Sequence, residues 1–333
     1  MTTGPLPRIW FERPVLPALA STVGAACVAL GPGTDEDRYA GIEEAIGAIA
    51  GASPYDGSVM DRAPALRVIA RTGIGYDAVD VVAATARGIA VCNTPDGPTI
   101  STAEHAVTLM LMVAKRVTPS ADALRTGTSA GYYARHAGIE LAGKMLGLVG
   151  CGRIARRVAT IAEAIGMQVV TFDPYCDPAG IPSQITRIDT LDELLRSADV
   201  VSVHVPLTDA SRGMFDAARF AAMRPGAVFV NTARGGLVDQ DALLAALDAG
   251  QLSGAGLDVT TPEPLPTDHP LLGREDVVVT PHVASATTDG KVRILQAAFE
   301  GAMAVVRGER PDHLVNPEVW DRVAAATAAG GHT

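Results

Sequence analysis

The chain alternates short apolar runs with longer segments in which apolar residues recur every three or four positions. Apolar runs of this length are typical of parallel strands buried on both faces, and the longer period is typical of the helices that cover them. In the first hundred residues the runs predict strands at Arg8–Phe11, Ala26–Leu30, Ala45–Ile49, Arg67–Ala70 and Ile89–Cys92. Helical spacing predicts helices over Ala78–Arg87 and Ser101–Arg116, the second with Ser101 as N-cap and Glu104 as its capping-box partner.

A second series of the same alternation begins at Met145. Its expected strands are Met145–Val149, Gln168–Phe172, Val200–Val205, Val228–Asn231, Gly254–Asp258 and Val277–Thr280. Its expected helices are Arg153–Ile165, Leu191–Ser197, Asp216–Met223 and Gln240–Ala249. Strands that alternate with helices predict doubly wound parallel sheets with right-handed crossovers.

The length of the chain, 333 residues, predicts two domains, because one core rarely grows beyond about 250–300 residues. A long helix expected over Thr287–Arg307 should return the chain to the first domain. We therefore expect one discontinuous domain from residues 1–100 and 288–333, and a second from 101–287. The last residues, Ala324–Thr333, are small and polar and are expected to fray.

A glycine turn at Gly150-Cys151-Gly152 follows one of the apolar runs and leads into the helix that starts with Arg153 and Ile154. Such a turn lets the backbone approach a pyrophosphate, whose charge the N–H groups of the next helix can bind. The next strand ends at Asp173, near the spacing of roughly 20 residues expected for a carboxylate that binds the adenosine ribose. The alternative is an ordinary tight turn between a strand and a helix.

Three ionisable residues follow other expected strands, where open α/β sheets bind ligands. Arg234 can grip a carboxylate through two parallel hydrogen bonds, and His282 can exchange a proton near neutral pH. Glu263 would stabilise the cationic form of His282. Each residue alone could be structural, but together, beside a dinucleotide, they indicate a catalytic site.

The composition limits the kinds of molecule that the protein is expected to bind. A net charge of −10 argues against a surface for nucleic acid or for an anionic membrane, and no run approaches the length of a membrane span. The four cysteines fit no zinc motif, so we expect no metal and no disulfide framework. The N-terminus is a poor signal peptide, so a cytoplasmic location is expected.

The motifs resemble those of the D-isomer-specific 2-hydroxyacid dehydrogenases. The resemblance runs in order over residues 67–290, and these segments carry it: Arg71-Thr72-Gly73-Ile74-Gly75-Tyr76-Asp77, Asn93-Thr94-Pro95, Ala103-Glu104-His105, Glu140-Leu141-Ala142-Gly143-Lys144, His204-Val205-Pro206-Leu207-Thr208, Asn231-Thr232-Ala233-Arg234-Gly235, Leu257-Asp258-Val259, Pro262-Glu263-Pro264-Leu265-Pro266 and Pro281-His282-Val283-Ala284. It implies two Rossmann-like or flavodoxin-like α/β domains with a cleft between them. Residues 1–100 with 288–333 would bind substrate, and 101–287 would bind NAD.

The resemblance also implies roles for individual residues. Arg234 would orient a 2-oxo acid, His282 would protonate its carbonyl oxygen, and Glu263 would keep His282 protonated. The backbone N–H groups of Ile74 and Gly75 would clamp the substrate carboxylate.

For the cofactor, the resemblance places Gly150, Gly152, Arg153 and Ile154 at the pyrophosphate, His204 and Pro206 on the adenine side, and Thr232, Asp258 and His282 near the nicotinamide. Asp173, followed by Pro174 and Tyr175, favours NAD over NADP, because a carboxylate repels a 2′-phosphate.

The expected reaction is the NAD-dependent interconversion of a small 2-oxo acid and its D-2-hydroxy acid by a homodimer. Glyoxylate or hydroxypyruvate is the favoured substrate, then 3-phosphoglycerate, then a bulkier acid. A chain of this length has no room for the regulatory domain of long phosphoglycerate dehydrogenases. Formate is disfavoured, since that branch has glutamine where this chain has Glu263. The alternatives are a non-catalytic NAD-sensing protein on the same scaffold and another enzyme that merely holds NAD.

Overall fold

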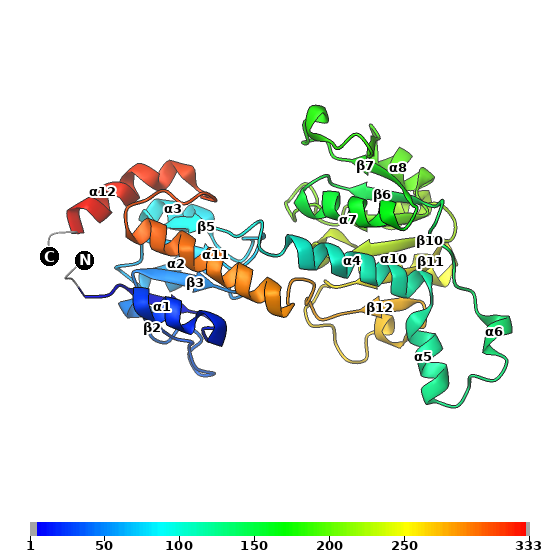
Figure 1. The fold of residues 1–333 in the computed structure, drawn as a ribbon, viewed down its shortest axis with the longest axis horizontal. Helices are drawn as coiled ribbons and strands as arrows, with labels where there is room; N and C mark the ends of the chain where they lie inside the picture. The colour runs from blue at the N-terminus through cyan, green and yellow to red at the C-terminus, as the bar shows by residue number, and fades with distance from the viewer. Residues whose placement is uncertain (1–4, 331–333) are drawn as a thin grey trace. The chain divides into compact units, whose positions relative to one another are not determined.

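The computed structural model describes residues 5–330 and divides the chain into two units (Figure 1). The first contains the described residues up to Pro98 and from Thr288 onward, and the second runs from Thr99 to Thr287. Both are parallel sheets with helices on both faces, which confirms the predicted α/β class.

The first unit contains a five-stranded sheet in the order β2-β1-β3-β4-β5, the flavodoxin-like order. The strands are β1 (Arg8–Phe11), β2 (Val28–Leu30), β3 (Gly47–Ala50), β4 (Val68–Arg71) and β5 (Ala90–Cys92). The helices are α1 (Ala20–Ala26), α2 (Gly57–Asp61), α3 (Val81–Arg87), α11 (Thr288–Val306) and α12 (Trp320–Gly330). Alternate residues of β1 enter the two cores: Ile9 and Phe11 pack toward α1 and α11, and Trp10 packs toward α2 and α3.

The second unit contains a seven-stranded sheet in the order β12-β11-β10-β9-β6-β7-β8. Numbered from the first strand of the unit, this is the Rossmann order with one further strand at the edge. The strands are β6 (Met145–Val149), β7 (Gln168–Phe172), β8 (Thr186–Arg187), β9 (Val200–Val203), β10 (Ala227–Asn231), β11 (Leu252–Leu257) and β12 (Val277–Val279).

Helices cover both faces of this sheet. On one face lie α4 (Thr99–Ala114) and α7 (Arg153–Ala164), and on the other lie α8 (Leu191–Ser197), α9 (Ala217–Ala222) and α10 (Gln240–Asp248). An arm formed by α5 (Val117–Arg125) and α6 (Tyr132–Arg135) leaves the sheet between α4 and β6 (Figure 1). Short 3₁₀ turns lie at Pro17–Leu19, Ile42–Glu44, Pro178–Gly180, Gly235–Leu237, Pro270–Gly273 and Pro317–Val319.

Two local predictions are wrong. The helix expected to begin after Ser101 begins at Thr99, directly after Pro98, whose fixed φ suits a helix start. Ser101 is therefore inside the helix, where its hydroxyl bonds that of Thr287 at 2.7 Å. The tail expected to fray from Ala324 continues as α12 to Gly330, because its alanines favour the helix; residues 331–333 lie outside the described residues.

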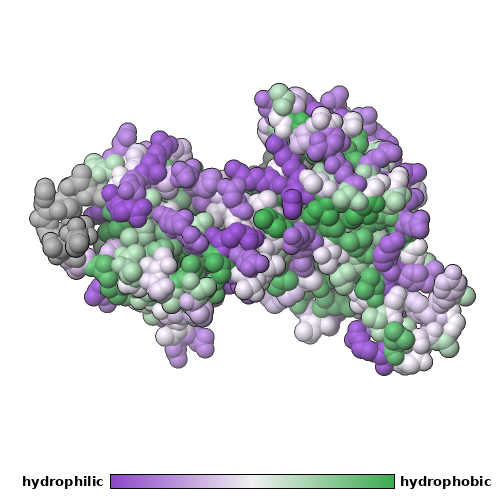
Figure 2. All heavy atoms as spheres, viewed as in Figure 1, coloured by the Kyte–Doolittle hydropathy of each residue, from purple (hydrophilic) through white to green (hydrophobic). Residues whose placement is uncertain are grey.

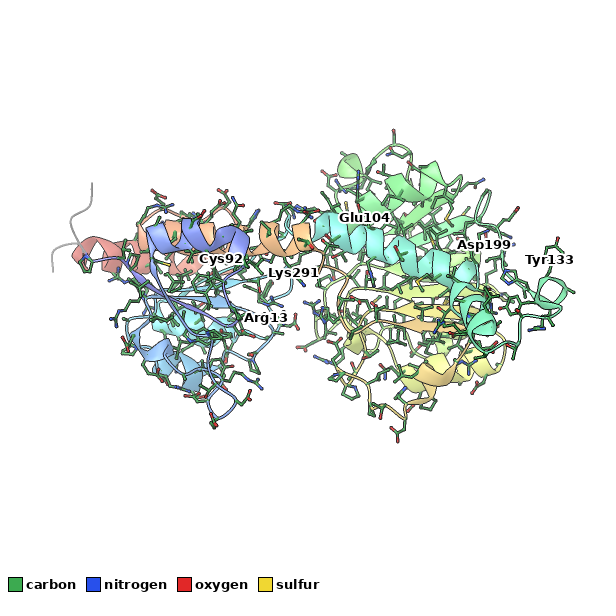
Figure 3. The ribbon with its side chains drawn as sticks, turned by 60° about the horizontal axis from the view of Figure 1, so that its bottom comes forward. Arg13, Cys92, Glu104, Tyr133, Asp199 and Lys291 are labelled. Atoms are coloured by element: carbon green, nitrogen blue, oxygen red, sulfur yellow. The ribbon has the colours of Figure 1, made fainter. Side chains whose placement is uncertain are left out.

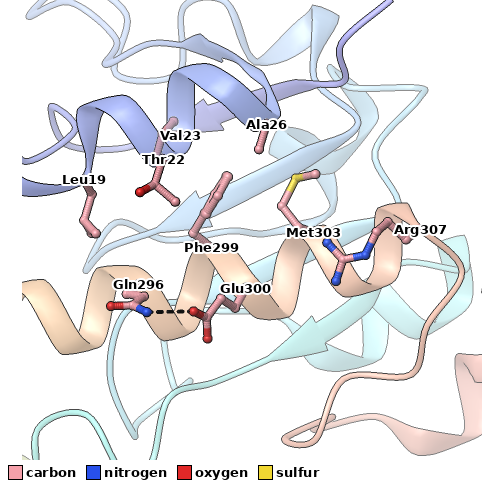
Figure 4. A pocket seen from close by; sticks show the side chains of 9 residues that line it. All are labelled: Leu19, Thr22, Val23, Ala26, Gln296, Phe299, Glu300, Met303 and Arg307. Atoms are coloured by element: carbon pink, nitrogen blue, oxygen red, sulfur yellow. Dashed lines mark hydrogen bonds between the residues drawn. The ribbon is translucent and has the colours of Figure 1, made fainter. Parts of the chain in front are cut away.

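The first unit has a small hollow of about 120 Å³ on the side where α1 and α11 pack together (Figure 4). Its walls are mostly apolar. Of its polar side chains, Gln296 and Glu300 come from α11 and bond each other at 2.8 Å, Thr22 comes from α1, and Arg307 follows α11. None of the predicted site residues lines this hollow, so the candidate site lies elsewhere.

Candidate active site

Five of the residues predicted to contact the cofactor lie in one row at the carboxyl edge of the second sheet. The last residues of six strands are in register: Phe172, Val149, Val203, Asn231, Leu257 and Val279. The residues that follow them form the row: Asp173, Gly150, His204, Thr232, Asp258 and Thr280. With strands about 4.8 Å apart, the row is about 24 Å long, which suits an extended dinucleotide.

The glycine turn lies in the middle of this row. Gly150 has φ +99°, and a Cβ there would lie 2.7 Å from the carbonyl oxygen of His204, so only glycine is accommodated. A Cβ on Gly152 would meet nothing within 4 Å, so the glycine keeps this side of the turn open. Gly152 is also the N-cap of α7 and has no side chain to cap the first turn, which begins with Arg153 and Ile154. These features fit a bound diphosphate.

Asp173 holds the loop next to the turn. One carboxylate oxygen accepts the N–H of Cys151 at 2.8 Å, and the other accepts those of Tyr175 and Cys176 at 2.9 and 3.2 Å. The half-exposed carboxylate thus joins the glycine turn to the end of β7. The oxygen that accepts from Cys151 has a second lone pair, so a hydroxyl group of a ribose can still bind to it.

His204 and Thr232 continue the row. Burial lowers the pKa of His204 to about 4, so the ring is neutral at pH 7, and its Nε2 lies 2.9 Å from the hydroxyl of Ser202. Pro206 is exposed two residues later. The Thr232 hydroxyl is buried and bonds no atom of the described residues. A buried hydroxyl without a partner is rare in native proteins, so a ligand atom is expected here.

Arg234 follows β10 in a loop that its neighbours hold in place. The buried side chain of Asn231 accepts the N–H of Ala233 and donates to the carbonyl of Arg234, both at 2.9 Å. A Cβ on Gly235 would lie 2.0 Å from the carbonyl oxygen of Thr260, so glycine is required where this loop touches the loop that carries Glu263.

Glu263 and His282 form the predicted pair: His282 Nδ1 lies 2.9 Å from Glu263 Oε2, and both side chains are partly exposed. The other oxygen of Glu263 accepts the N–H of Thr260 at 3.0 Å. Burial raises the pKa of Glu263, but the hydrogen bonds from His282 and Thr260 and the charges of His282 and Arg234 outweigh it. The pKa of this carboxyl therefore lies below its ordinary value.

His282 lies in a strained turn. Its φ is +53°, and the only other non-glycine residue of the described chain with positive φ is Arg116. Its N–H bonds the carbonyl oxygens of Asp258 and Thr280 at 2.8 and 3.0 Å. Residues in such conformations gather at functional sites, where the surroundings hold them.

Asp258 is the residue that holds the turn of His282 in place. Its buried carboxylate accepts the N–H groups of Val283 and Ala284 at 2.9 and 2.8 Å and the hydroxyl of Thr280 at 2.6 Å. Burial raises the pKa of Asp258, but these bonds and that from His105 outweigh it, so the pKa lies below its ordinary value. Asp258 therefore acts on the catalytic turn through the backbone.

Ile74 and Gly75 belong to the first unit, in the loop after β4. The side chain of Asn93 donates to the carbonyl of Ile74 at 2.7 Å, and the hydroxyl of Thr94 accepts the N–H of Gly73 at 2.8 Å. Within residues 5–330, no protein atom accepts the N–H of Ile74 or Gly75.

Sequence reasoning did not assign roles to Asn231, Thr280 or His105, each of which bonds a predicted site residue or its loop. The position of Asn231 and Thr280 at strand ends was a usable signal, but the contact of His105 depends on tertiary packing. In the described part of the chain, no group of three or more His, Cys, Asp or Glu side chains could hold a metal ion.

Comparison with known proteins identifies the family. Residues 107–284 match the model of the NAD-binding domain of D-isomer-specific 2-hydroxyacid dehydrogenases. The chain therefore belongs to the D-isomer-specific 2-hydroxyacid dehydrogenase family, as the motifs predicted.

Individual relatives include enzymes with two different names. The chain is 41% identical to D-3-phosphoglycerate dehydrogenase of Mycobacterium tuberculosis over 287 residues, which are 85% of this chain and 54% of that protein. It is 40% identical to glyoxylate reductase of Korarchaeum cryptofilum over 268 residues, 80% of this chain and 81% of that protein. A crystal structure of a protein from Thermus thermophilus is 40% identical, with a TM-score of 0.83 over 92% of this chain and 99% of that one. The chain spans about half the length of the phosphoglycerate dehydrogenases that it matches.

Proposed function

We propose that the protein is an NAD-dependent oxidoreductase that interconverts a small 2-oxo acid and its D-2-hydroxy acid. The observation that carries this proposal is the pairing of His282 with Glu263 beside Asp258, on the same sheet edge as the glycine turn. A structural histidine would not need a carboxylate partner and a strained backbone at the end of this row.

The residues of the row fit NAD. Gly150, Gly152, Arg153 and Ile154 would hold the pyrophosphate, and Asp173 would bind the adenosine ribose. His204 and Pro206 would lie on the adenine side, while Thr232, Asp258 and His282 would lie toward the nicotinamide. When bound, this cofactor supplies or accepts the hydride.

The side chains of the site would transfer a proton and stabilise the charges that form during the reaction. His282 uses Nδ1 for Glu263, which leaves Nε2 to give a proton to the carbonyl oxygen during reduction and to remove it during oxidation. Arg234 would bind the substrate carboxylate and stabilise the negative charge that grows on the carbonyl oxygen. Glu263, as a carboxylate bonded to Nδ1, would orient the His282 ring and stabilise a positive charge on it.

For the substrate, we propose glyoxylate or hydroxypyruvate first and 3-phosphoglycerate second, which agrees with the names of the two relatives above. The N–H groups of Ile74 and Gly75 would bind the carboxylate. Their lack of acceptors among the described residues supports this role.

The test is NADH consumption with a panel of 2-oxo acids: glyoxylate, hydroxypyruvate, 3-phosphohydroxypyruvate, pyruvate and a branched 2-oxo acid. We expect turnover of at least one, and His282→Ala should abolish it. His269→Ala is the control, since its ring lies in the same unit but outside the row. Tight NADH binding without turnover of any acid would instead favour an NAD-sensing protein.

We further propose a cytoplasmic homodimer. None of the described helices is long and apolar enough to cross a membrane. Leu124 of α5 is 72% exposed, and Tyr133 of α6, labelled in Figure 3, is 98% exposed. Figure 2 shows hydrophobic residues exposed on this side of the second unit, where a second copy could cover them. Size-exclusion chromatography with light scattering tests this: a dimeric mass is expected, which Leu124→Asp should reduce to that of a monomer.

A further inference from the structure

The second unit places a histidine from α4 against the buried carboxylate that holds the catalytic turn. His105 Nε2 lies 3.4 Å from Asp258 Oδ1 and 2.9 Å from the hydroxyl oxygen of Thr280. The His105 side chain is 21% exposed, and that of Asp258 is fully buried. The expected cofactor and substrate contacts do not include this ring.

The packing of α4 on β11 explains how the ring reaches this position. Gly254, Gly256 and Asp258 point to the same face of the strand, since side chains alternate along it. A Cβ on Gly254 would touch Val113, and a Cβ on Gly256 would touch Leu109, at 2.6 and 2.8 Å.

Val113, Leu109 and His105 are spaced four apart, so they lie along one ridge of the helix. Four helical residues rise about 6 Å and two strand residues about 6.6 Å, so the ridge keeps step with the strand. His105 therefore meets Asp258 because two glycines let the helix lie close to β11.

The hydrogen bonds fix where the protons are. Asp258 has a lowered pKa and accepts only, so the single proton of the Thr280 hydroxyl points to Asp258 Oδ1 at 2.6 Å. The oxygen of Thr280 must then accept from His105, which requires a proton on Nε2. The chain of donors runs from His105 through Thr280 to Asp258.

This chain ends at the turn that carries His282. Three successive N–H groups, those of His282, Val283 and Ala284, bond the carbonyl or carboxylate oxygens of Asp258. The position of the His282 ring thus depends on the orientation of the Asp258 carboxylate, which Thr280 and His105 set.

From this geometry we infer that His105 is a positioning residue of the reaction: by donating from Nε2 to Thr280, which in turn donates to Asp258, it holds the turn that presents His282 to the substrate. The inference rests on the proposed function for its kinetic consequence, but its structural part is independent of any activity.

The experiment compares His105→Ala with His105→Gln, whose side-chain amide can still donate to Thr280. In His105→Ala, kcat should fall about tenfold, the effect of one charge-assisted hydrogen bond, while KM for the 2-oxo acid changes by less than about twofold. His105→Gln should recover at least about half of the lost kcat. Thr108→Ala, an exposed residue of the same helix, is the matched control and should leave kcat unchanged.

A second measurement separates positioning from general destabilisation. Hydrogen–deuterium exchange of the peptide that contains Val283 and Ala284 should be about tenfold faster in His105→Ala and close to wild type in His105→Gln. Leu109→Val, on the same ridge, should lower the melting temperature without changing this exchange selectively.

These readouts distinguish the two ways of failing. If the wild type reduces no 2-oxo acid, the proposed function is wrong, and the exchange result alone decides the role of His105. If the wild type is active but His105→Ala matches it in kcat and in exchange, the role assigned to His105 is overturned. An equal loss of kcat in the Ala and Gln variants also overturns it, because the donor would then not matter.

Discussion

The hydrogen bond between His282 and Glu263 can be tested by Glu263→Gln, which removes a charge and keeps the size of the side chain. Glu263 uses one oxygen for the N–H of Thr260 and the other for His282 Nδ1. Glutamine has only one acceptor oxygen, so one of the two bonds is lost, and the amide no longer stabilises a cationic ring.

The geometry gives the size of the effect. A hydrogen bond to a charged group contributes about 1.5–3 kcal/mol. His282 and Glu263 are 45% and 36% exposed, so solvent screens their charges and the lower end of the range applies. About 1.5 kcal/mol corresponds to a roughly tenfold lower rate of reduction at pH 7.

The assay is NADH consumption at saturating 2-oxo acid between pH 5.5 and 9, repeated with 4-deuterated NADH to show that hydride transfer limits the rate. Glu309→Gln is the control, since it neutralises a carboxylate that pairs with Arg307 on the surface of the first unit. A Glu263→Gln variant with the wild-type rate at every pH would refute the assigned role of the pair.

Three other predictions concern neighbouring residues. Asp173→Ala should lower kcat/KM with NADH and raise it with NADPH, because the carboxylate that repels a 2′-phosphate is gone. The ratio of kcat/KM with NADH to kcat/KM with NADPH is measured for this variant and for the control Asp177→Ala. A ratio that Asp173→Ala leaves unchanged contradicts the NAD preference. Gly235→Ala should destabilise the fold by about 1–3 kcal/mol, since its Cβ would overlap the carbonyl of Thr260, whereas Gly24→Ala has open space; calorimetric melting of both variants tests this. The pKa of Asp258 is lowered in the folded protein, so its contribution to stability is present above the ordinary range near pH 4 and is lost as pH falls through the lower folded value. Urea unfolding between pH 2.5 and 6 should therefore show a shallower acid loss in Asp258→Asn, and parallel curves would show that this carboxylate is not responsible.

Much of the fold was predictable because parallel strands buried on both faces must be apolar along their whole length. Val200–Val203 is such a run, and every residue of it is buried. The bounds of helices were less predictable, since they depend on local choices. Pro98 could start α4 before Ser101, and the alanines after Trp320 could extend α12 despite their small size.

The chemistry of the site was predictable to the extent that it follows strand ends. Asp173 and Asp258 directly follow their strands, so position along the chain indicated their place in the sheet. The pairing of Glu263 with His282 joins two loops, and there the resemblance to a family supplied what spacing alone could not. Neither the position of residues at strand ends nor the resemblance to a family predicted the contact between His105 and Asp258. This contact depends on which helix lies on which strand.

The register of the second sheet gives a rule for finding site residues along the whole row. Six strands end level with one another, so the residue after each strand belongs to the same edge, whatever its chemistry. Applied to β12, the rule selects Thr280, whose hydroxyl joins Asp258 to His105. Applied to β11, it selects Asp258, and the glycines two and four residues earlier show where a helix can lie close. Two apolar residues of α4 face those glycines. A histidine that lies four residues before the first of them and eight before the second is then expected beside the carboxylate. His105 is in that position.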